Sequence, residues 1–504
     1  MEHTLDNNLN KKILFWIDVD SLFLLIAHIF NSKTNSELYS IYDVPDKTKN
    51  FFENQSLVNF KKQWFFHDHI KKNDDYDIEY LSNIEKKYGI DLWKLSINER
   101  FFYRFNRFYK FSRNEILSIL EQECKLFEKI LDEINPDCLI MLDPPVHHSK
   151  LLHDMAHHRG VKTLSMYTSR IGPTSIVHTD HMLDFEKLYP NAKGSITNFE
   201  TLRQKWNTAN YTDTIKRIIA TKDDDSITEQ IDMLKNYLFD SSNNKETHYT
   251  YYGRSKPRVL NDAIKFTTGK KSRKRFIDKN LTKEPDLNSK FVYFPLSDEE
   301  EGQILHYSSF HTNQIESVRH IAKSIPIDYQ LFVKEHPARG IRGWRTIEEY
   351  NELLDIPNVV LLHPTVNQQT LFENCSLVVT LRGTAGLEAA FYGKPTLIFG
   401  DIFYSVMPSV YQVKHLSNLP ELIHSALNTR VNPIDVDRFF DLVINNSVRF
   451  NELDYYSLLY AEFFHGGKLV DVEISEEKMK IFFEKNSEYL AIIADEFIKK
   501  VKIC

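Results

Sequence analysis

The chain has 504 residues, 42% of them hydrophobic and 26% charged, with a formal net charge of −7 at pH 7. This length exceeds what one hydrophobic core supports, so we expect two or three domains, and the negative charge argues against a nucleic-acid-binding protein. The four cysteines form no CxxC pair, which indicates neither a zinc knuckle nor a disulfide framework and fits a reducing cytoplasm.

The first third of the chain alternates predicted strands and helices. Apolar runs at 12–19, 137–143 and 161–167 are typical of buried strands. Amphipathic segments at 114–134 and 149–160 are typical of helices. This alternation predicts a parallel sheet with helices on both faces.

The most apolar segment, 13–30, contains Asp18 and Asp20. Charges at the centre of a membrane span cost about 2.5–3.5 kcal/mol each, so we expect no transmembrane helix and a cytoplasmic protein, able to lie at the inner face of the cytoplasmic membrane. Asp-x-Asp after a strand also occurs in haloacid-dehalogenase-type phosphatases and in the metal site of GT-A glycosyltransferases. The other phosphatase motifs do not follow in order, and a GT-A motif would lie deeper in the chain. We therefore interpret the two aspartates as solvated carboxylates at a strand end.

Residues 181–285 are polar, rich in Asn, Asp, Lys and Thr, and their helical periodicity is interrupted. The pattern predicts an inserted or linking helical region. Its end, 254–279, is strongly basic and could attract anionic lipid or a lipid-linked acceptor, since each Lys or Arg near such a surface contributes roughly 1 kcal/mol. A solvated linker helix explains the same run equally well.

A second strand–helix alternation begins at Lys290. Its five apolar runs lie at 291–296, 329–334, 358–363, 376–381 and 395–400. We predict an α/β fold of two Rossmann-type doubly wound domains that face a cleft, as in a GT-B arrangement. The predicted parts are an N-terminal domain (1–180), the helical insertion (181–285), a C-terminal domain (286–430) and C-terminal helices that pack back on the N-terminal domain (431–504).

Ligands of open α/β sheets bind beyond the carboxyl ends of the strands, so the residues after each strand are candidates. Lys334 and His336 follow the second strand of the C-terminal half, and both side chains can bind a phosphate. Pro337 restricts His336 to an extended conformation. Alternatively, the His-Pro dipeptide merely ends a strand, and the same dipeptide recurs at His363.

The loop "RGTAGLE" (382–388) follows the fourth strand of that half. Thr384 is a plausible helix N-cap, and the free backbone N–H groups beyond it could bind an anion. Gly383 and Gly386 would let a phosphate approach the backbone. Glu388 lies one residue too late for a capping box, so it could accept hydrogen bonds from ribose hydroxyls. An ordinary tight turn is the alternative interpretation.

Four segments occur together in an order typical of one family: "FPLSDEEEGQ" (294–303), "NQIESVRHIAKSIPIDYQLFVKEHP" (313–337), "PNVVLLHP" (357–364) and "TLRGTAGLEAAFYGKPTLIFG" (380–400). Over about 290–405 the chain resembles the bacterial capsule and surface-polysaccharide biosynthesis proteins, which include Kdo-transferring capsule enzymes. The resemblance implies a GT-B-type glycosyltransferase. It also implies that the nucleotide-sugar donor is bound by His336, Gly383, Thr384, Gly386 and Glu388, and we add Lys334 and Arg382 as neighbours.

The family's Pro-Leu-x-x-x-x-Glu segment corresponds to Pro295, Leu296 and Glu301, which makes Glu301 a candidate catalytic residue. This chain lacks the proline often found before that Glu, so the alignment can shift to Glu299 or Glu300.

The implied reaction moves a sugar from a nucleotide donor, CMP- or UDP-linked, to a hydroxyl of a glycan or lipid-linked acceptor. It needs no metal or other cofactor, because helix N–H groups and His336 can neutralise the leaving phosphate. The general base would come from the N-terminal half, with Asp143 as first candidate and Asp18 and Asp20 next.

Two alternative functions stay open. One is a teichoic-acid-type polyol-phosphate transferase, which usually has Asp-Tyr-Ser-Ser where this chain has Arg-Gly-Thr-Ala. The other is a non-catalytic protein that binds a nucleotide sugar. His153 and His157 have a workable spacing for metal ligands, and two further histidines lie in 146–148, but no HExxH motif occurs and we predict no metal site.

Overall fold

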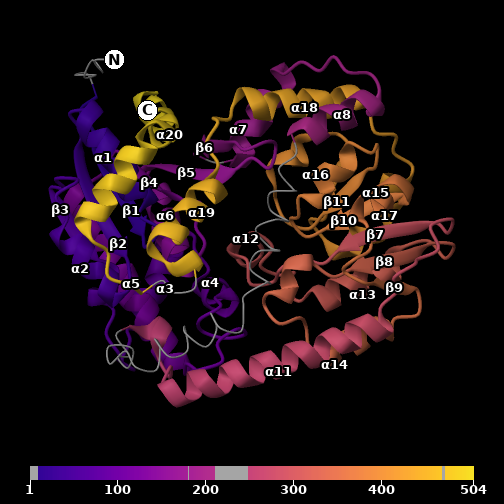
Figure 1. The fold of residues 1–504 in the computed structure, drawn as a ribbon, viewed down its shortest axis with the longest axis horizontal. Coiled ribbons are helices and arrows are strands. Elements are labelled where there is room, and N and C mark those ends of the chain that lie inside the picture. The colour runs from indigo at the N-terminus through magenta and orange to yellow at the C-terminus, as the bar shows by residue number, and fades with distance from the viewer. Residues whose placement is uncertain (1–8, 180, 210–247, 468–470, 504) are drawn as a thin grey trace. The chain divides into compact units, whose positions relative to one another are not determined.

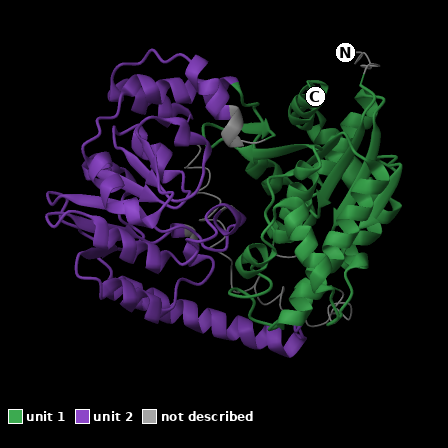
Figure 2. Cartoon of the chain, turned by 180° about the vertical axis from the view of Figure 1, so that it is seen from behind, with its two compact units in different colours: residues 1–179, 246–252, 446–504 green, residues 180–245, 253–445 purple. Residues whose placement is uncertain are grey.

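The computed structural model describes residues 9–179, 181–209, 248–467 and 471–503. The chain divides into two compact units (Figure 2). Unit 1 comprises 1–179, 246–252 and 446–504, and unit 2 comprises 180–245 and 253–445. The middle of the predicted insertion lies outside the described residues. Among the helices that are described, none is long and apolar enough to cross a membrane.

Unit 1 is built on a six-stranded sheet of order β3-β2-β1-β4-β5-β6 (Figure 1). Its strands are β1 (Lys12–Asp18), β2 (Glu37–Asp43), β3 (Lys62–Phe65), β4 (Cys138–Leu142), β5 (Lys162–Thr168) and β6 (Ser175–His178). All neighbours pair in parallel except β6, which is antiparallel to β5. Alternate side chains of β1 enter two different cores: Phe15 lies in one, and Leu14 and Trp16 lie in the other.

Helices cover both faces of this sheet. One core contains α1 (Leu22–Lys33) together with the C-terminal helices α19 (Glu452–Phe463) and α20 (Glu476–Lys502). The other contains α3 (Ile78–Tyr88), α5 (Arg113–Ile134) and α6 (His147–His158). Helix α5 begins with a capping box, in which the Ser112 hydroxyl accepts from the Glu115 N–H and the Glu115 carboxylate accepts from the Ser112 N–H.

Unit 2 contains a second six-stranded sheet, of order β12-β11-β10-β7-β8-β9, in which every pair is parallel. Its strands are β7 (Phe291–Pro295), β8 (Gln330–Lys334), β9 (Val359–Leu362), β10 (Leu377–Thr380), β11 (Thr396–Ile398) and β12 (Val410–Gln412). One core contains α13 (Gln314–Ser324), α14 (Ile347–Leu354), α17 (Leu419–Leu427) and the end of α11 (Lys256–Asn280). The other contains α15 (Gln368–Asn374) and α16 (Ala385–Ala390).

The two sheets share one connectivity. In each, the first strand lies in the middle, the chain proceeds outward to one edge, and it then returns to pair on the other side of the first strand. This confirms two doubly wound α/β domains. The order of strands reverses between β1 and β4 in unit 1 and between β7 and β10 in unit 2. Ligands of such sheets bind at that switch point, beyond the carboxyl ends of the strands.

Candidate functional site

The loop after β10 has the predicted local structure. Thr384 is the N-cap of α16, but its side chain makes no capping bond to the backbone. Its hydroxyl instead lies 3.5 Å from Oε1 of Glu388. The Glu388 side chain is half-buried, and its Oε2 lies 3.5 Å from Nε2 of Gln368. Glu388 therefore takes no part in a capping box, as predicted.

The two glycines of this loop are needed for packing within the protein. A Cβ at Gly383 would lie 2.7 Å from Oγ1 of Thr380, and a Cβ at Gly386 would overlap the Tyr404 hydroxyl and lie 2.6 Å from Cγ2 of Thr396. The Tyr404 hydroxyl donates to the Gly383 carbonyl at 2.6 Å, and Oγ1 of Thr396 donates to the Gly386 carbonyl at 2.9 Å. The close approach that these glycines permit is to β11 and Tyr404, and a second role in phosphate binding stays a prediction.

The segment after β8 lies on the other side of β7. Lys334 is buried at the end of β8, and His336 is half-buried. Nδ1 of His336 is buried without a hydrogen-bond partner among the described residues. Glu335, between them, is fully occupied: its carboxylate accepts from the His336 N–H at 2.8 Å, from Nε of Arg345 at 3.0 Å and from the Tyr350 hydroxyl at 2.9 Å. Glu335 thus fixes the backbone that carries His336.

Three arginines neutralise the acidic run after β7. Arg345 is fully buried, and its Nη1 lies 2.6 Å from Oε1 of Glu299. Although burial lowers the pKa of Arg345, the charges of Glu335 and Glu299 raise it above its usual value. Arg339 and Arg342 lie within ion-pair distance of both Asp298 and Glu300. These ion pairs join the loop after β7 to the segment after β8.

Glu301 and Arg382 lie at the border of this region. Glu301 is the exposed N-cap of α12 (Gly302–Tyr307), and unlike Glu299 and Glu300 it forms no ion pair in the described part of the chain. Arg382 lies 4.3 Å from the ring centre of Tyr307 and donates from Nε to the Asp401 carbonyl at 2.5 Å. The catalytic role of Glu301 stays a prediction.

In unit 1, carboxylates gather at the corresponding sheet edge. Asp143 follows β4 and is 8% exposed. Asp18 accepts from Nε1 of Trp16 at 2.9 Å, and Asp20 accepts from the Leu22 N–H at 3.1 Å. Burial raises the pKa of both aspartates, and the nearby charges of Asp20 and Asp43 raise the pKa of Asp18 further. Our interpretation of Asp20 as a solvated carboxylate was wrong, because it is 8% exposed.

Glu452, the first residue of α19, joins this group from the C-terminal part of the chain. Its Oε2 lies 3.4 Å from Oγ1 of Thr168, at the end of β5. Burial raises the pKa of Glu452 to about 7, and the charge of Asp20 contributes, although a hydrogen bond from Tyr456 opposes the shift. No sequence motif marked this residue, since nothing in its neighbourhood indicates a return to β1 and β5.

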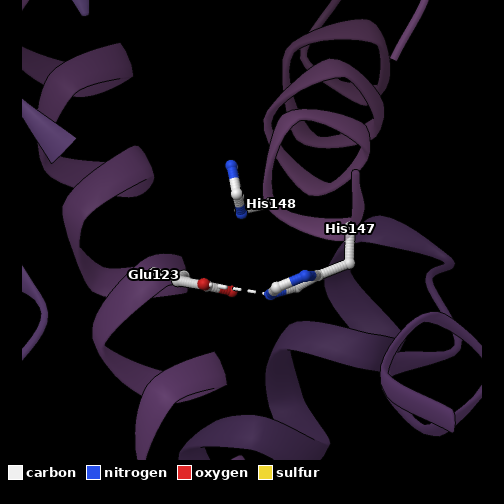
Figure 3. A group of neighbouring side chains, drawn as sticks. All are labelled: Glu123, His147 and His148. Carbon is white, nitrogen blue, oxygen red and sulfur yellow. Dashed lines mark hydrogen bonds and ion pairs between the residues drawn. The ribbon is translucent and has the colours of Figure 1, made fainter. Parts of the chain in front are cut away.

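A continuous chain of buried polar groups lies beside these carboxylates. His147, the first residue of α6, approaches Oε2 of Glu99 through Nδ1 at 2.9 Å and Oε1 of Glu123 through Nε2 at 3.1 Å (Figure 3). The Tyr249 hydroxyl lies 3.3 Å from the same Glu123 oxygen and 2.9 Å from Nδ1 of His148. His148 continues through Nε2 to Oδ2 of Asp43 at 2.7 Å. The other oxygen of this aspartate lies 2.8 Å from Nε2 of His67.

Glu123, His147 and His148 are close enough to be tested as metal ligands, and among the described residues they form the single such group. They do not fit a metal. Both ring nitrogens of His147 face carboxylates, whose charges raise its pKa to about 10 despite burial, so the ring is protonated and has no lone pair to offer. The Tyr249 hydroxyl occupies the space between Glu123 and His148. His153, considered earlier, contacts Asp154 instead, at 3.0 Å.

Comparison with known families identifies the part of the chain that holds the unit 2 sheet. Residues 217–418 match the family model for "Capsule polysaccharide biosynthesis protein". The chain carries a capsule polysaccharide biosynthesis domain. This confirms the resemblance seen in the sequence. The domain includes β7 to β12, and β1 to β6 of unit 1 lie outside the match. Among curated proteins, no significant match is found.

Solved structures similar to the chain around this capsule biosynthesis domain include three from different organisms. The β-Kdo 2,7-transferase KpsC of Thermosulfurimonas dismutans is 11% identical, with 76% of this chain and 92% of that one covered and a TM-score of 0.31. The UDP-GlcNAc 2-epimerase of Methanocaldococcus jannaschii is 10% identical, with 86% and 98% covered and a TM-score of 0.23. Anabaena Alr3699/HepE, solved with UDP and glucose, is 10% identical, with 90% and 99% covered and a TM-score of 0.24. TM-scores of this size carry no argument, so the fold rests on the sheet topology itself.

Proposed function

We propose that the protein is a glycosyltransferase of bacterial surface-polysaccharide synthesis, which moves a sugar from a nucleotide-sugar donor to a hydroxyl of a glycan or lipid-linked acceptor. The observation that carries this proposal is the convergence of two family segments at one sheet edge. His336 follows β8 and Glu388 follows β10, and these two strands are the immediate neighbours of β7. The capsule biosynthesis match covers both segments.

The donor, CMP- or UDP-linked, would occupy the carboxyl edge of the unit 2 sheet. His336 offers an imidazole nitrogen that no described residue uses, and Lys334, Arg382 and the Gly383–Gly386 backbone supply further donors for the phosphates. Glu388 would accept hydrogen bonds from ribose hydroxyls. Protonated and cationic groups of the protein neutralise the departing nucleotide in this scheme, which therefore requires no metal or other cofactor.

The acceptor hydroxyl would lose its proton to a carboxylate of unit 1. Asp143 is the candidate that strand position favours, and Glu452 is the one that its pKa of about 7 favours, because a base works best when its pKa lies near the working pH. Such a carboxylate group supports a transferase over a protein that only binds nucleotide sugars. Asp143→Asn and Glu452→Gln compare the two candidates, and the base is the one whose loss stops transfer while donor binding persists.

The donor site is tested with a matched pair of histidines. His336→Ala should lower transfer at least 100-fold, because the departing phosphate loses a partner in the transition state. His363→Ala, at the other His-Pro dipeptide, should leave transfer within about twofold, since His363 contacts Thr365 and Asp278 at the end of β9. Glu388→Ala should behave like His336→Ala.

A thermal-shift screen with CMP-, UDP-, GDP- and dTDP-sugars identifies the donor. A ligand at 100 times its Kd should stabilise the protein by about 2.7 kcal/mol. Equal transfer by the His336 and His363 variants, or no shift with any of the four donor classes, would refute the assignment.

The basic helix α11 supports a location at an anionic membrane surface, in contact with a lipid-linked acceptor. It spans Lys256–Asn280 and buries only Ile277 among its described side chains. Lys271, Arg275 and Lys279 are exposed at helical spacing with Ile264, which is 57% exposed. Reversing Lys271 and Arg275 to Glu should reduce co-sedimentation with anionic vesicles, and unchanged co-sedimentation would exclude this contact.

A further inference from the structure

A segment with an unusual composition joins α4 (Leu92–Asn98) to α5 in unit 1. Residues 100–113, "RFFYRFNRFYKFSR", contain seven aromatic and five basic residues and no acidic one. Neither the proposed donor site nor the carboxylate group uses this segment. Aromatic and basic side chains in alternation are suited to a ligand that is apolar at one end and anionic at the other.

The segment borders a cavity of about 520 Å³, which lies in the size range of small-molecule sites. Trp93 and Ile97 line it from one face of α4 and are 40% and 53% exposed, and Tyr103 lines it from the loop and is 69% exposed. Large apolar side chains exposed together indicate a binding surface rather than chance exposure. Most of the cavity wall is therefore apolar and accessible.

The cavity adjoins the buried polar chain of unit 1. Phe102, which is buried and lines the cavity, has its ring centre 4.7 Å from that of His147 and 5.7 Å from that of Tyr249. These are the same two residues that lead through His148 to Asp43 at the sheet edge. A molecule in the cavity would thus lie one aromatic layer away from the polar chain.

The charge of the cavity wall is positive. Lys110 and Arg113 line it, and no Asp or Glu does. In the part of the chain that the structure describes, Lys110 has no ion-pair partner, and Arg113 donates to the Tyr76 hydroxyl at 2.5 Å rather than to a carboxylate. The remaining polar lining is neutral, from Ser96 and Asn106 among others. A bare sugar would leave both cations unpaired, whereas an anionic head group would neutralise them.

We propose that this cavity binds an anionic amphiphile, with its alkyl chain against Trp93, Ile97 and Phe102 and its phosphate group against Lys110 and Arg113. The occupant is a single lipid molecule and not the surface of a bilayer, because the apolar wall is a cavity and the cations are at its lining. Binding as such does not depend on the glycosyltransferase assignment. Identifying the amphiphile as the lipid part of the acceptor rests on the proposed function.

The test is titration calorimetry of the full chain with monomeric dodecyl phosphate. Saturable binding is expected. Octyl phosphate should bind on the order of 100-fold more weakly, since each buried methylene contributes about the same increment. The Lys110→Gln/Arg113→Gln variant should bind dodecyl phosphate about 25-fold more weakly, at roughly fivefold for each cation.

Matched controls isolate the site. Lys94→Gln/Lys129→Gln removes two cations from α4 and α5 that do not line the cavity, and its affinity should equal that of the unaltered protein. Inorganic phosphate should not compete, and uncharged dodecyl maltoside should bind at least tenfold more weakly. Equal affinity for the maltoside, an unchanged affinity in the Lys110/Arg113 variant, or binding seen only with anionic vesicles would each overturn the proposal.

The outcome separates from that of the donor screen. Dodecyl phosphate binding without any nucleotide-sugar shift would refute the proposed function and leave the amphiphile site in place. A nucleotide-sugar shift without dodecyl phosphate binding would do the reverse. If both bind, transfer to a lipid-phosphate acceptor by the Lys110/Arg113 variant should show a raised KM for the acceptor with an unchanged KM for the donor.

Discussion

The two sheets have the same connectivity, yet their carboxyl edges neutralise buried carboxylates in different ways. In unit 2 the partners of the acidic run are three arginines, and Arg345 is fully buried between Glu299 and Glu335. In unit 1 the partners are histidines, with His147 between Glu99 and Glu123. A further group in unit 1, which includes Asp20 and Glu452, has raised pKa values.

The difference teaches which edge responds to protons. A guanidinium stays charged at every physiological pH, so the unit 2 edge keeps one charge state and one shape. Imidazole and raised carboxyl groups exchange protons near neutrality, so the unit 1 edge changes its charge in the range where it works. This division suits a rigid site for a charged nucleotide in unit 2 and proton transfer in unit 1.

The largest expected effect comes from breaking the arginine cluster. Arg345→Leu should destabilise unit 2 by roughly 3–5 kcal/mol, because Glu299 and Glu335 would stay buried without a cation. The loss should be the same at pH 6 and pH 9, since arginine does not titrate there. Urea denaturation at both pH values measures it. Arg319→Leu, which removes an exposed ion pair with Glu352, should cost less than about 1 kcal/mol. A loss that varies with pH would contradict the fixed-charge description of this edge.

Replacing the corresponding histidine should give a loss that depends on pH. The pKa of His147 is about 10 in the folded protein, above the ordinary value, so its protonation stabilises the fold fully below pH 6.5 and progressively less as the pH rises to 10. His147→Gln should therefore destabilise unit 1 by roughly 3 kcal/mol at pH 6 and by clearly less at pH 10. Denaturation curves across this range test the sign. His153→Gln on the same helix should cost under about 1 kcal/mol at both ends.

The smallest effect has the opposite sign. Because the pKa of Glu452 is raised to about 7, its ionisation destabilises the fold as the pH rises from the unfolded value near 4.5 through 7. Glu452→Gln should therefore match the unaltered protein at pH 5 and be more stable by roughly 2 kcal/mol at pH 8. Glu462→Gln, on the same helix and exposed in a pair with Lys478, should show no such gain. A Glu452 variant that is less stable at pH 8 would show that this carboxylate is held as an anion.

Much of the fold could be predicted because buried parallel strands are short continuous apolar runs. All eight runs assigned to strands correspond to strands of the two sheets. The missed strands have other patterns: β2 and β3 mix polar and aromatic residues, β6 is antiparallel, and β12 has only three residues. Without tertiary partners, such segments cannot be told apart from loops.

For the candidate sites, the sequence placed His336 and the 382–388 loop at one sheet edge because strand order follows from the alternation of elements. It could not place Glu452 or Tyr249, which reach unit 1 from distant parts of the chain. It also could not pair the acidic run with its arginines, since those ion pairs depend on how two loops fold. The glycines were recognised as necessary, but their packing partners, Thr396 and Tyr404, were not.

The division of unit 1 into three segments has a consequence for synthesis on the ribosome. The chain passes from one unit to the other after residues 179, 245, 252 and 445. Unit 2 is complete once residue 445 has emerged, whereas the unit 1 sheet still lacks α19 and α20, which cover one of its faces. Unit 2, although second in the sequence, can therefore finish folding first. The N-terminal sheet would wait with an apolar face uncovered until translation ends, which makes it the part of the nascent chain most in need of a chaperone.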